Sequence, residues 1–475
     1  MKDKEDGNGN GESQDKNDDG RGGIWDSLDD ASRTELEAFA LDYREFLSAS
    51  KTERAVVANA LAMAGRAGLA CLEGGGAPAA GGGWLDFHGK LLGLWVPGSQ
   101  PPTGGFNIIV VHGDAPRLDI KPRCVMEEAG FGLLKSNLYG GLKKYQWLAR
   151  PLALWGFCAL KDGRTVDVRF GEEPDDPVLT ITDILPHLDR KIQREKKVQD
   201  AFPAERLNVL ANSVPAAGVK GRSRVKKALL DILLKRWGIG EDDLVSSELE
   251  IVPAGPAREV GLDGSLLGGY GHDDRLNVFC ALRSALAVKK PKRPVLVVVF
   301  DREEIGSYGT TGAESNFITR LAARAFKASG LEPNWHEVTE ALARSRALSA
   351  DVEAAADPVF KEATEDLNSA RMGRGPCVVR YTGGAGKYGA SEARAEYMAF
   401  IRRTFDGAGV VWQSTLLGKQ EEGGGGTVAL HLAYHGVSIV DCGAPVLSMH
   451  SPFEICSKAD LWMNHKAQSA FLASE

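Results

Sequence analysis

Two adjacent glutamates, Glu303 and Glu304, directly follow a run of apolar residues at 295–300, VLVVVF. That run predicts a strand buried on both faces of a parallel sheet. In open α/β sheets the ligand crevice lies outside the carboxyl ends of the strands, so the pair falls where chemistry is expected. One carboxylate can bind a metal ion while its neighbour takes a proton from the water that the ion activates. A solvated acidic turn is the alternative interpretation.

His112 follows a second apolar run, at 106–111, and Asp114 lies two residues further on. Positions i and i+2 of an extended chain share a face, so Asp114 is predicted to hydrogen-bond the imidazole from outside the metal site and to fix its tautomer. The alternative for His112 is a histidine of the core.

Asp273 and Asp274 lie after a glycine-rich loop and just before a predicted helix with an apolar face. One acid at this place is often a helix cap, and the helix dipole favours it. Two adjacent acids are more than a cap requires, and Asp273 is therefore a candidate ligand.

Two further candidates lie at later strand ends or turns, Asp351 after a short strand and His450 in a turn before the last helix. A set of two imidazoles and three carboxylates suits a pair of zinc, cobalt or manganese ions, with one carboxylate bridging the two. Glu303 remains as the general base. The predicted ligands are His112, Asp273, Glu304, Asp351 and His450.

The elements that must position these residues predict an α/β fold, with a mixed, largely parallel sheet sandwiched by helices. We expect residues 24–122 and 249–475 to form this domain. Residues 123–248 alternate short apolar and polar segments and predict an inserted smaller β-rich domain for dimerisation or as a lid. The alternative is that this segment belongs to the main sheet.

Several segments outside the sheet have clear signatures. Residues 1–23 are polar, charged and glycine-rich and predict a disordered tail. Residues 25–72 predict two amphipathic helices, and GGGAPAAGGG at 74–83 predicts a loop. A basic helix is expected at 187–199 and another at 224–238.

Composition excludes several classes of protein. A net charge of -7 argues against nucleic acid as a partner. The sequence has neither an apolar run of the roughly 18 residues that a membrane span needs nor a signal segment, so we expect no membrane partner and a cytoplasmic location. Seven scattered cysteines without a CxxC pair read as small buried residues. The absence of HExxH argues against a single-zinc protease of that type.

Six motifs occur in the order known for one family, and they are HGDAPRLDIKP, GHDDRLN, FDREEIGS, SADVEAAADP, EEGGGGT and MHSPFE. From about Trp25 to Phe471 the chain resembles the aspartyl aminopeptidase and vacuolar aminopeptidase I family of cocatalytic dizinc metallopeptidases. The resemblance implies a zinc-peptidase/phosphorylase-like fold and two divalent metal ions per subunit. Zinc is the expected metal, with cobalt or manganese as alternatives.

The resemblance also implies a role for each ligand. Asp273 would bridge the two metals, and the peptide bond after it is often cis in such families. His112 and Asp351 would complete one site, Glu304 and His450 would complete the other, and Glu303 would be the base.

Substrate and assembly follow from the same resemblance. It implies peptide substrates, a substrate-binding role for Lys387, and a homo-oligomer in the form of a tetrahedral dodecamer built from dimers. His187 is the candidate for a residue that reaches the neighbouring subunit's site, with Lys191 as the alternative.

The predicted function is a metal-dependent aminopeptidase that removes N-terminal amino acids from peptides. The alternatives are a carboxypeptidase or amide deacylase of the same fold, and an inactive shell or binding protein.

Overall fold

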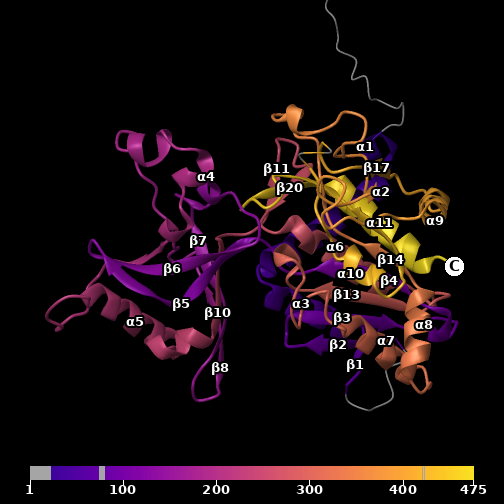
Figure 1. Cartoon of the computed structure of the whole chain (residues 1–475), viewed down its shortest axis with the longest axis horizontal. Coiled ribbons are helices and arrows are strands. Elements are labelled where there is room, and N and C mark those ends of the chain that lie inside the picture. The colour runs from indigo at the N-terminus through magenta and orange to yellow at the C-terminus, as the bar shows by residue number, and fades with distance from the viewer. Residues whose placement is uncertain (1–22, 74–80, 420, 422) are drawn as a thin grey trace, which may run out of the picture.

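The computed structural model describes residues 23–73, 81–419, 421 and 423–475. Most of the predicted tail and of the loop at 74–83 therefore lies outside the described residues. The chain is a mixed α/β protein with three sheets, which confirms the predicted class. Figure 1 shows the largest sheet with the helices around it on the right and the second sheet, with α4 and α5, on the left.

The main sheet has nine strands. At its centre β13, β4, β14 and β18 run parallel to one another, and antiparallel strands flank them. In spatial order the strands are β1 (Ala70–Cys71), β2 (Gly83–Phe87), β3 (Leu91–Val96), β13 (Val295–Phe300), β4 (Asn107–His112), β14 (Arg346–Ser349), β18 (Ser438–Gly443), β16 (Cys377–Val379) and β17 (Gln413–Thr415).

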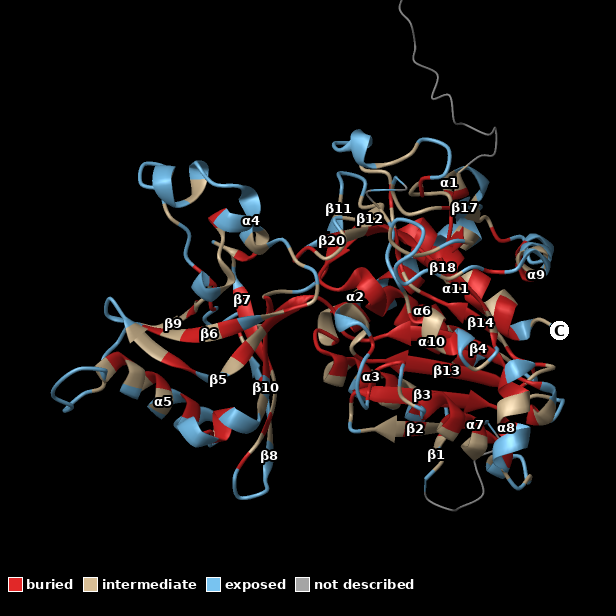
Figure 2. Ribbon diagram, viewed as in Figure 1, coloured by how far each residue is buried: buried red, intermediate tan, exposed pale blue. Residues whose placement is uncertain are grey.

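Alternate residues of β13 enter two different cores. Val295, Val297 and Val299 belong to a core that includes residues of α2, α3, α6, α9 and α11. Leu296, Val298 and Phe300 point to the opposite face, where α7, α8 and α10 contribute. Burial on both faces explains the unbroken apolar run in the sequence, and Figure 2 shows these central strands buried.

Eleven α-helices are found among the described residues, and side-chain caps begin several of the longer ones. Asp29, Thr52 and Ser457 accept hydrogen bonds from backbone N–H groups at the starts of α2, α3 and α11. The helices are α1 (Ile24–Ser27), α2 (Asp30–Ala49), α3 (Glu53–Arg66), α4 (Val198–Ala201), α5 (Arg224–Trp237), α6 (His272–Ala287), α7 (Phe317–Ala328), α8 (Trp335–Ala343), α9 (Ala395–Gly407), α10 (Ala429–Ala433) and α11 (Lys458–Ala473).

The second sheet has six antiparallel strands and a core of its own. Leu229 and Leu233 of α5 are buried in that core. In spatial order the strands are β8 (Thr165–Phe170), β7 (Leu152–Ala159), β10 (Ser247–Pro253), β5 (Arg117–Glu128), β6 (Phe131–Tyr139) and β9 (Val209–Asn212).

The small sheet has five strands, which come from three separate parts of the chain. It holds the turn that carries His450, between β19 and β20. Its strands are β11 (Arg258–Val260), β12 (Leu266–Gly269), β20 (Glu454–Ser457), β19 (Pro445–Leu447) and β15 (Glu353–Ala354).

The prediction of a basic helix at 187–199 is wrong. The structure has a π-turn at 190–194 and the short α4 instead. Leu188 and Val198 are 63% and 64% exposed, so a longer helix would have no apolar surface to cover. Helices in proteins depend on such packing.

The cysteines correct one further expectation. All seven are free, and six are buried, but Cys71 at the start of the main sheet is exposed. No helix within the described ranges has the length and apolar character that a membrane crossing requires.

Candidate metal centre

Three parallel strands of the main sheet end at the same edge, and four of the candidate site residues lie at or just after their ends. His112 is the last residue of β4 and pairs with Phe300, the last residue of β13. Glu303 and Glu304 begin a short 3-10 turn directly after β13. Asp351 lies two residues beyond the end of β14. Neighbouring parallel strands thus place an imidazole and three carboxylates at one edge.

Asp273 lies at the start of α6, where its backbone is not helical and its peptide bond to Asp274 is cis. Its carboxylate lies between two imidazoles. Oδ1 is 3.1 Å from His112 Nε2, and Oδ2 is 3.2 Å from His450 Nε2. One carboxylate therefore faces two histidines that come from segments far apart in the sequence.

The remaining two candidates complete each half of the cluster. Asp351 Oδ1 is 3.8 Å from His112 Nε2, and Glu304 Oε2 is 3.5 Å from His450 Nε2. His112, Asp273 and Glu304 also offer ligand atoms within 4.8 Å of one another. The structure thus brings together all five candidate ligands, and Glu303 is adjacent to them.

The charges of the cluster are strongly perturbed. Burial alone would lower the pKa of His450, but Asp273 and Glu304 raise it to about 10. Burial likewise opposes protonation of His112, yet the neighbouring carboxylates of Asp114, Asp273 and Asp351 raise its pKa well above the usual range. Without a metal ion, these carboxylates therefore stabilise positive charge on the two imidazoles, at the place where a cation would lie.

Glu303 and Glu304 have pKa values raised above the ordinary range of a glutamate. Burial is the first cause for both. The pKa of Glu303 rises to about 8, with the neighbouring Asp351, Asp114 and Asp273 contributing. A carboxyl group whose pKa lies near neutrality can both accept and donate a proton.

The donor set fits a pair of divalent ions. Asp273 Oδ1 and Glu304 Oε1 are buried oxygens without a hydrogen-bond partner among the described residues. Two ligands held about 2.0–2.1 Å from a tetrahedral zinc lie roughly 3.3 Å apart. The separations of 3.1, 3.2 and 3.5 Å between imidazole nitrogens and carboxylate oxygens match that spacing.

Asp114 lies beside His112, whose Nδ1 is 3.1 Å from the backbone O of Asp114. Its carboxylate is 3.3 Å from His112 Nδ1 and accepts hydrogen bonds from the backbone N–H groups of Glu303 and Glu304, each at 3.2 Å. It therefore aligns one ring and two backbone groups at once.

Two acids at the site were not among the sequence candidates. Asp274 accepts a hydrogen bond from His112 N–H at 3.3 Å, and its side chain lies within reach of the same imidazole as Asp351. Glu454 accepts from Asp273 N–H at 3.0 Å and from His450 N–H at 2.7 Å. The motif MHSPFE contains Glu454, but only the folded chain shows its two partners.

Lys387 is exposed in a turn where its backbone N–H donates to Gly384 O, and His187 is exposed before the π-helical turn. His187 does not belong to the groups of described residues that could share a metal ion.

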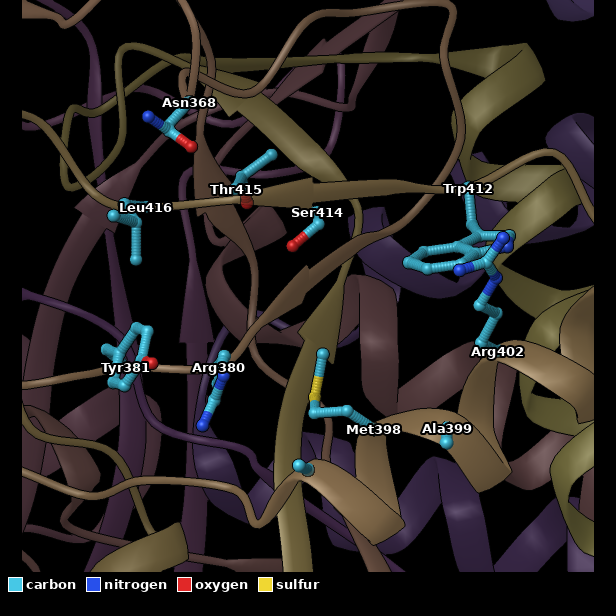
Figure 3. Close-up of a pocket in the computed structure, with 11 residues that line it drawn as sticks. Asn368, Arg380, Tyr381, Met398, Ala399, Arg402, Trp412, Ser414, Thr415 and Leu416 are labelled. Atoms are coloured by element: carbon cyan, nitrogen blue, oxygen red, sulfur yellow. The ribbon is translucent and has the colours of Figure 1, made fainter.

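A pocket of about 470 Å³ lies at the edge of the main sheet, between α9 and β17 (Figure 3). None of its lining residues belongs to the ligand cluster, so it is separate from the metal centre. Its lining includes Arg380, Tyr381, Met398, Arg402, Trp412 and Leu416.

A mixed α/β sheet that gathers imidazoles and carboxylates at its strand ends has the architecture of a metal-dependent hydrolase. The family model described as "Aminopeptidase I zinc metalloprotease (M18)" matches residues 46–472. The chain belongs to this family.

Individual relatives agree with that assignment. A "Probable M18 family aminopeptidase 1" of Borreliella afzelii is 41% identical over 450 residues, covering 94% of this chain and 98% of the relative. One of Thermotoga maritima is 39% identical over 452 residues, covering 93% and 96%. A crystal structure of the M18 aminopeptidase of Thermotoga maritima has a TM-score of 0.90 at 38% identity, covering 95% of this chain and 99% of that one. The chain is thus an aminopeptidase of a zinc metalloprotease family, and so a hydrolase of peptide bonds.

Proposed function

We propose that this aminopeptidase uses two divalent metal ions, with zinc as the expected metal, bound by the five clustered ligands. The observation that carries the proposal is the Asp273 carboxylate, whose two oxygens face His112 and His450 separately. Asp273 would be shared by both ions, His112 and Asp351 would complete one site, and Glu304 and His450 would complete the other.

Bound ions would lower the pKa of a water molecule and polarise the scissile carbonyl. Glu303 takes a proton from that water on its carboxylate as the water oxygen bonds to the carbonyl carbon. It then passes the proton to the leaving nitrogen as the C–N bond breaks, so that an amino acid and a shortened peptide result. The position of Glu303 next to the ligand Glu304, directly after β13, supports both transfers.

The finer description of the fold is part of this proposal. Residues 24–122 and 249–475 form the catalytic domain, and residues 123–248 form an inserted domain for dimerisation or as a lid. The separate core of the second sheet supports an inserted unit, and β5 (from Arg117) and β10 (to Pro253) extend this unit a few residues beyond those bounds on each side. Exposed apolar side chains there, such as Leu188 and Val198, support a role in subunit contact.

We also propose a homo-oligomer, in the form of a tetrahedral dodecamer built from dimers. A solved structure of a yeast aminopeptidase, described as a dodecamer, shares the fold with a TM-score of 0.73 at 19% identity. Substrate binding by Lys387, a contribution of His187 to a neighbouring site, and the cytoplasmic location stay predictions.

One assay tests the function against its nearest rivals. A peptide amide with a free N-terminal amine and its N-acetylated form are incubated with the zinc-loaded protein. We expect hydrolysis of the free-amine substrate alone, and loss of that activity with a chelator. Preferential cleavage of the acetylated substrate would instead support a deacylase, and turnover that a chelator leaves unchanged would reject the metal mechanism.

A further inference from the structure

The last residue of β6 connects the second sheet to the metal centre. The Tyr139 hydroxyl donates a hydrogen bond to Asp114 Oδ2 at 2.9 Å, and both side chains are buried. Asp114 in turn faces His112 Nδ1 and accepts from the backbone of Glu303 and Glu304. Tyr139 therefore fixes the carboxylate that aligns one half of the cluster.

Two residues further on, the same segment reaches the other half. His450 Nδ1 lies 2.8 Å from Gly141 O, to which it donates a hydrogen bond. Nε2 is directed at Asp273 and Glu304. In the neutral ring, donation from Nδ1 leaves the lone pair on Nε2, where a cation can bind. The identity of the partner on one ring nitrogen thus sets what the other nitrogen can bind.

Gly140, between them, lies tightly against a predicted ligand. Its φ is +74°, and a Cβ placed there would lie 3.3 Å from Glu304 Cβ and 3.2 Å from Pro116 Cα. A side chain at this position would be strained and would press on Glu304.

Contacts within the second sheet fix the position of Tyr139. The Arg117 guanidinium lies 3.8 Å from the centre of the Tyr139 ring, and these two residues are paired across β5 and β6. Arg117 Nε is 3.1 Å from Glu250 Oε2 on β10. The position of the hydroxyl is therefore determined by the second sheet and not by the strand ends of the main sheet.

We propose that residues 139–141 are a positioning element of the metal centre, through which the second sheet orients His112, His450 and Glu304. The proposal rests on the proposed two-metal function and extends it, because it makes the geometry of the ligands depend on a segment that supplies no ligand itself.

The first test removes one hydroxyl. In Tyr139→Phe we expect zinc affinity, measured by competition with a chromogenic chelator, to fall roughly tenfold, and kcat at saturating zinc to fall by a similar factor while KM changes little. Tyr397→Phe is the matched control, since that hydroxyl is also buried and donates to a backbone oxygen, Ala347 O, at 2.7 Å. Zinc affinity and kcat in the control should stay within about twofold of the unmodified protein. Equal effects in the two variants would overturn the proposal.

The second test adds one methyl group. Gly140→Ala should displace Glu304 and weaken zinc binding by roughly tenfold or more. Gly171→Ala is the control, because Gly171 also has a positive φ, of +90°, and its Cβ would also lie 3.2 Å from its nearest neighbour, Ala153 Cα, within the second sheet. Thermal unfolding in excess chelator measures the cost to the fold alone. If both variants lose similar stability and only Gly140→Ala loses zinc affinity, the proposal is supported; equal losses of zinc affinity reject it.

The unmodified protein separates this inference from the proposed function. Should it bind zinc but hydrolyse no peptide, the proposed function would fail, while the zinc affinities of the variants would still decide the positioning role. Should it bind no zinc at all, both would be overturned.

Discussion

At the scale of single residues, the centre consists of acids that would repel one another without a cation. Asp351, Glu303 and Glu304 all have pKa values raised above those of ordinary carboxyl groups, with burial the first cause. Asp273, whose two oxygens lie 3.1 and 3.2 Å from imidazole nitrogens, instead has a lowered pKa despite its burial. Such an arrangement is unfavourable for a protein alone and suitable for binding divalent ions.

Glu303 can be tested without disturbing metal binding. In Glu303→Gln, which removes the proton acceptor but no predicted ligand, kcat should fall by about 10²–10⁴-fold. The metal content, measured by elemental analysis, should stay at that of the unmodified protein. Glu304→Gln is the contrast, and it should lose metal as well as activity. Near-normal turnover in Glu303→Gln would reject its role as the base.

Asp273 should be the most sensitive of the ligands. In Asp273→Ala both ions lose a ligand at once, so we expect neither to stay bound after gel filtration. Asp460→Asn is the control, since Asp460 is a buried carboxylate outside the cluster that accepts from Gly373 and Gly375 N–H. It should keep both ions even where it is less stable. Two tightly bound ions in Asp273→Ala would contradict the bridge.

The residues that the sequence predicts and those it misses differ in a physical way. His112, Glu303 and Asp351 follow apolar strands, so their common location follows from the rule for strand ends. Tyr139 and Glu454 carry no such local signal, because their partners are brought to them only by tertiary packing.

At the scale of elements, a pattern of apolar residues predicts a strand or a helix correctly where the folded protein offers a surface for those residues to pack against. The run at 295–300 forms β13 with the predicted bounds, because both of its faces are buried. The predicted helix at 224–238 forms as α5 (Arg224–Trp237), with Val225, Leu229 and Leu233 buried. At 187–199 the apolar residues stay exposed, and the expected helix is replaced by a π-turn and one short helix.

The packing of α11 predicts a dependence of stability on pH. His465 lies on α11 with its ring stacked on Phe39 of α2, at 4.5 Å between ring centres, and hydrogen-bonds with Ser284 of α6. Burial lowers its pKa to about 4. The unfolded chain binds a proton near pH 6.5, so the stabilisation is present above pH 6.5 and is lost as the pH falls toward 4.

Comparison with His465→Gln isolates this contribution. Between pH 7 and 4 the free energy of unfolding of the unmodified protein should fall by up to roughly 3 kcal/mol more than that of the variant. Denaturant unfolding across that range provides the measurement, and His336→Gln on the exposed face of α8 is the control. If His465→Gln showed the same pH dependence as the unmodified protein, the assignment would be wrong.

At the scale of the whole molecule, a buried cluster of charges joins the second sheet to the helices of the main sheet. Arg117 of β5 lies 3.4 Å from Glu53 at the start of α3 and 3.1 Å from Glu250 of β10. Lys90, in the turn between β2 and β3, lies 2.8 Å from Glu53. The relative position of the two sheets, and with it the contact of Tyr139 with Asp114, depends on this cluster.

Replacing Arg117 by Met keeps a long apolar side chain but leaves Glu53 and Glu250 with less positive charge. Removal of one partner of a buried ion pair typically costs about 3–5 kcal/mol, and we expect a loss of that size in denaturant unfolding at pH 7. Lys121→Met, which breaks an exposed pair with Glu205, should cost less than about 1 kcal/mol.

The sign of the pH dependence distinguishes this cause from a simple loss of packing. Burial already raises the pKa of Glu250 in the unmodified protein. Without Arg117 the folded-state pKa values of Glu250 and Glu53 should both rise, so protonation stabilises the variant at low pH and that stabilisation is lost as the pH rises. The deficit of Arg117→Met relative to the unmodified protein should therefore grow from pH 5 to pH 8. A deficit that is the same at both pH values would mean that the guanidinium acts at this junction through its volume and not through its charge.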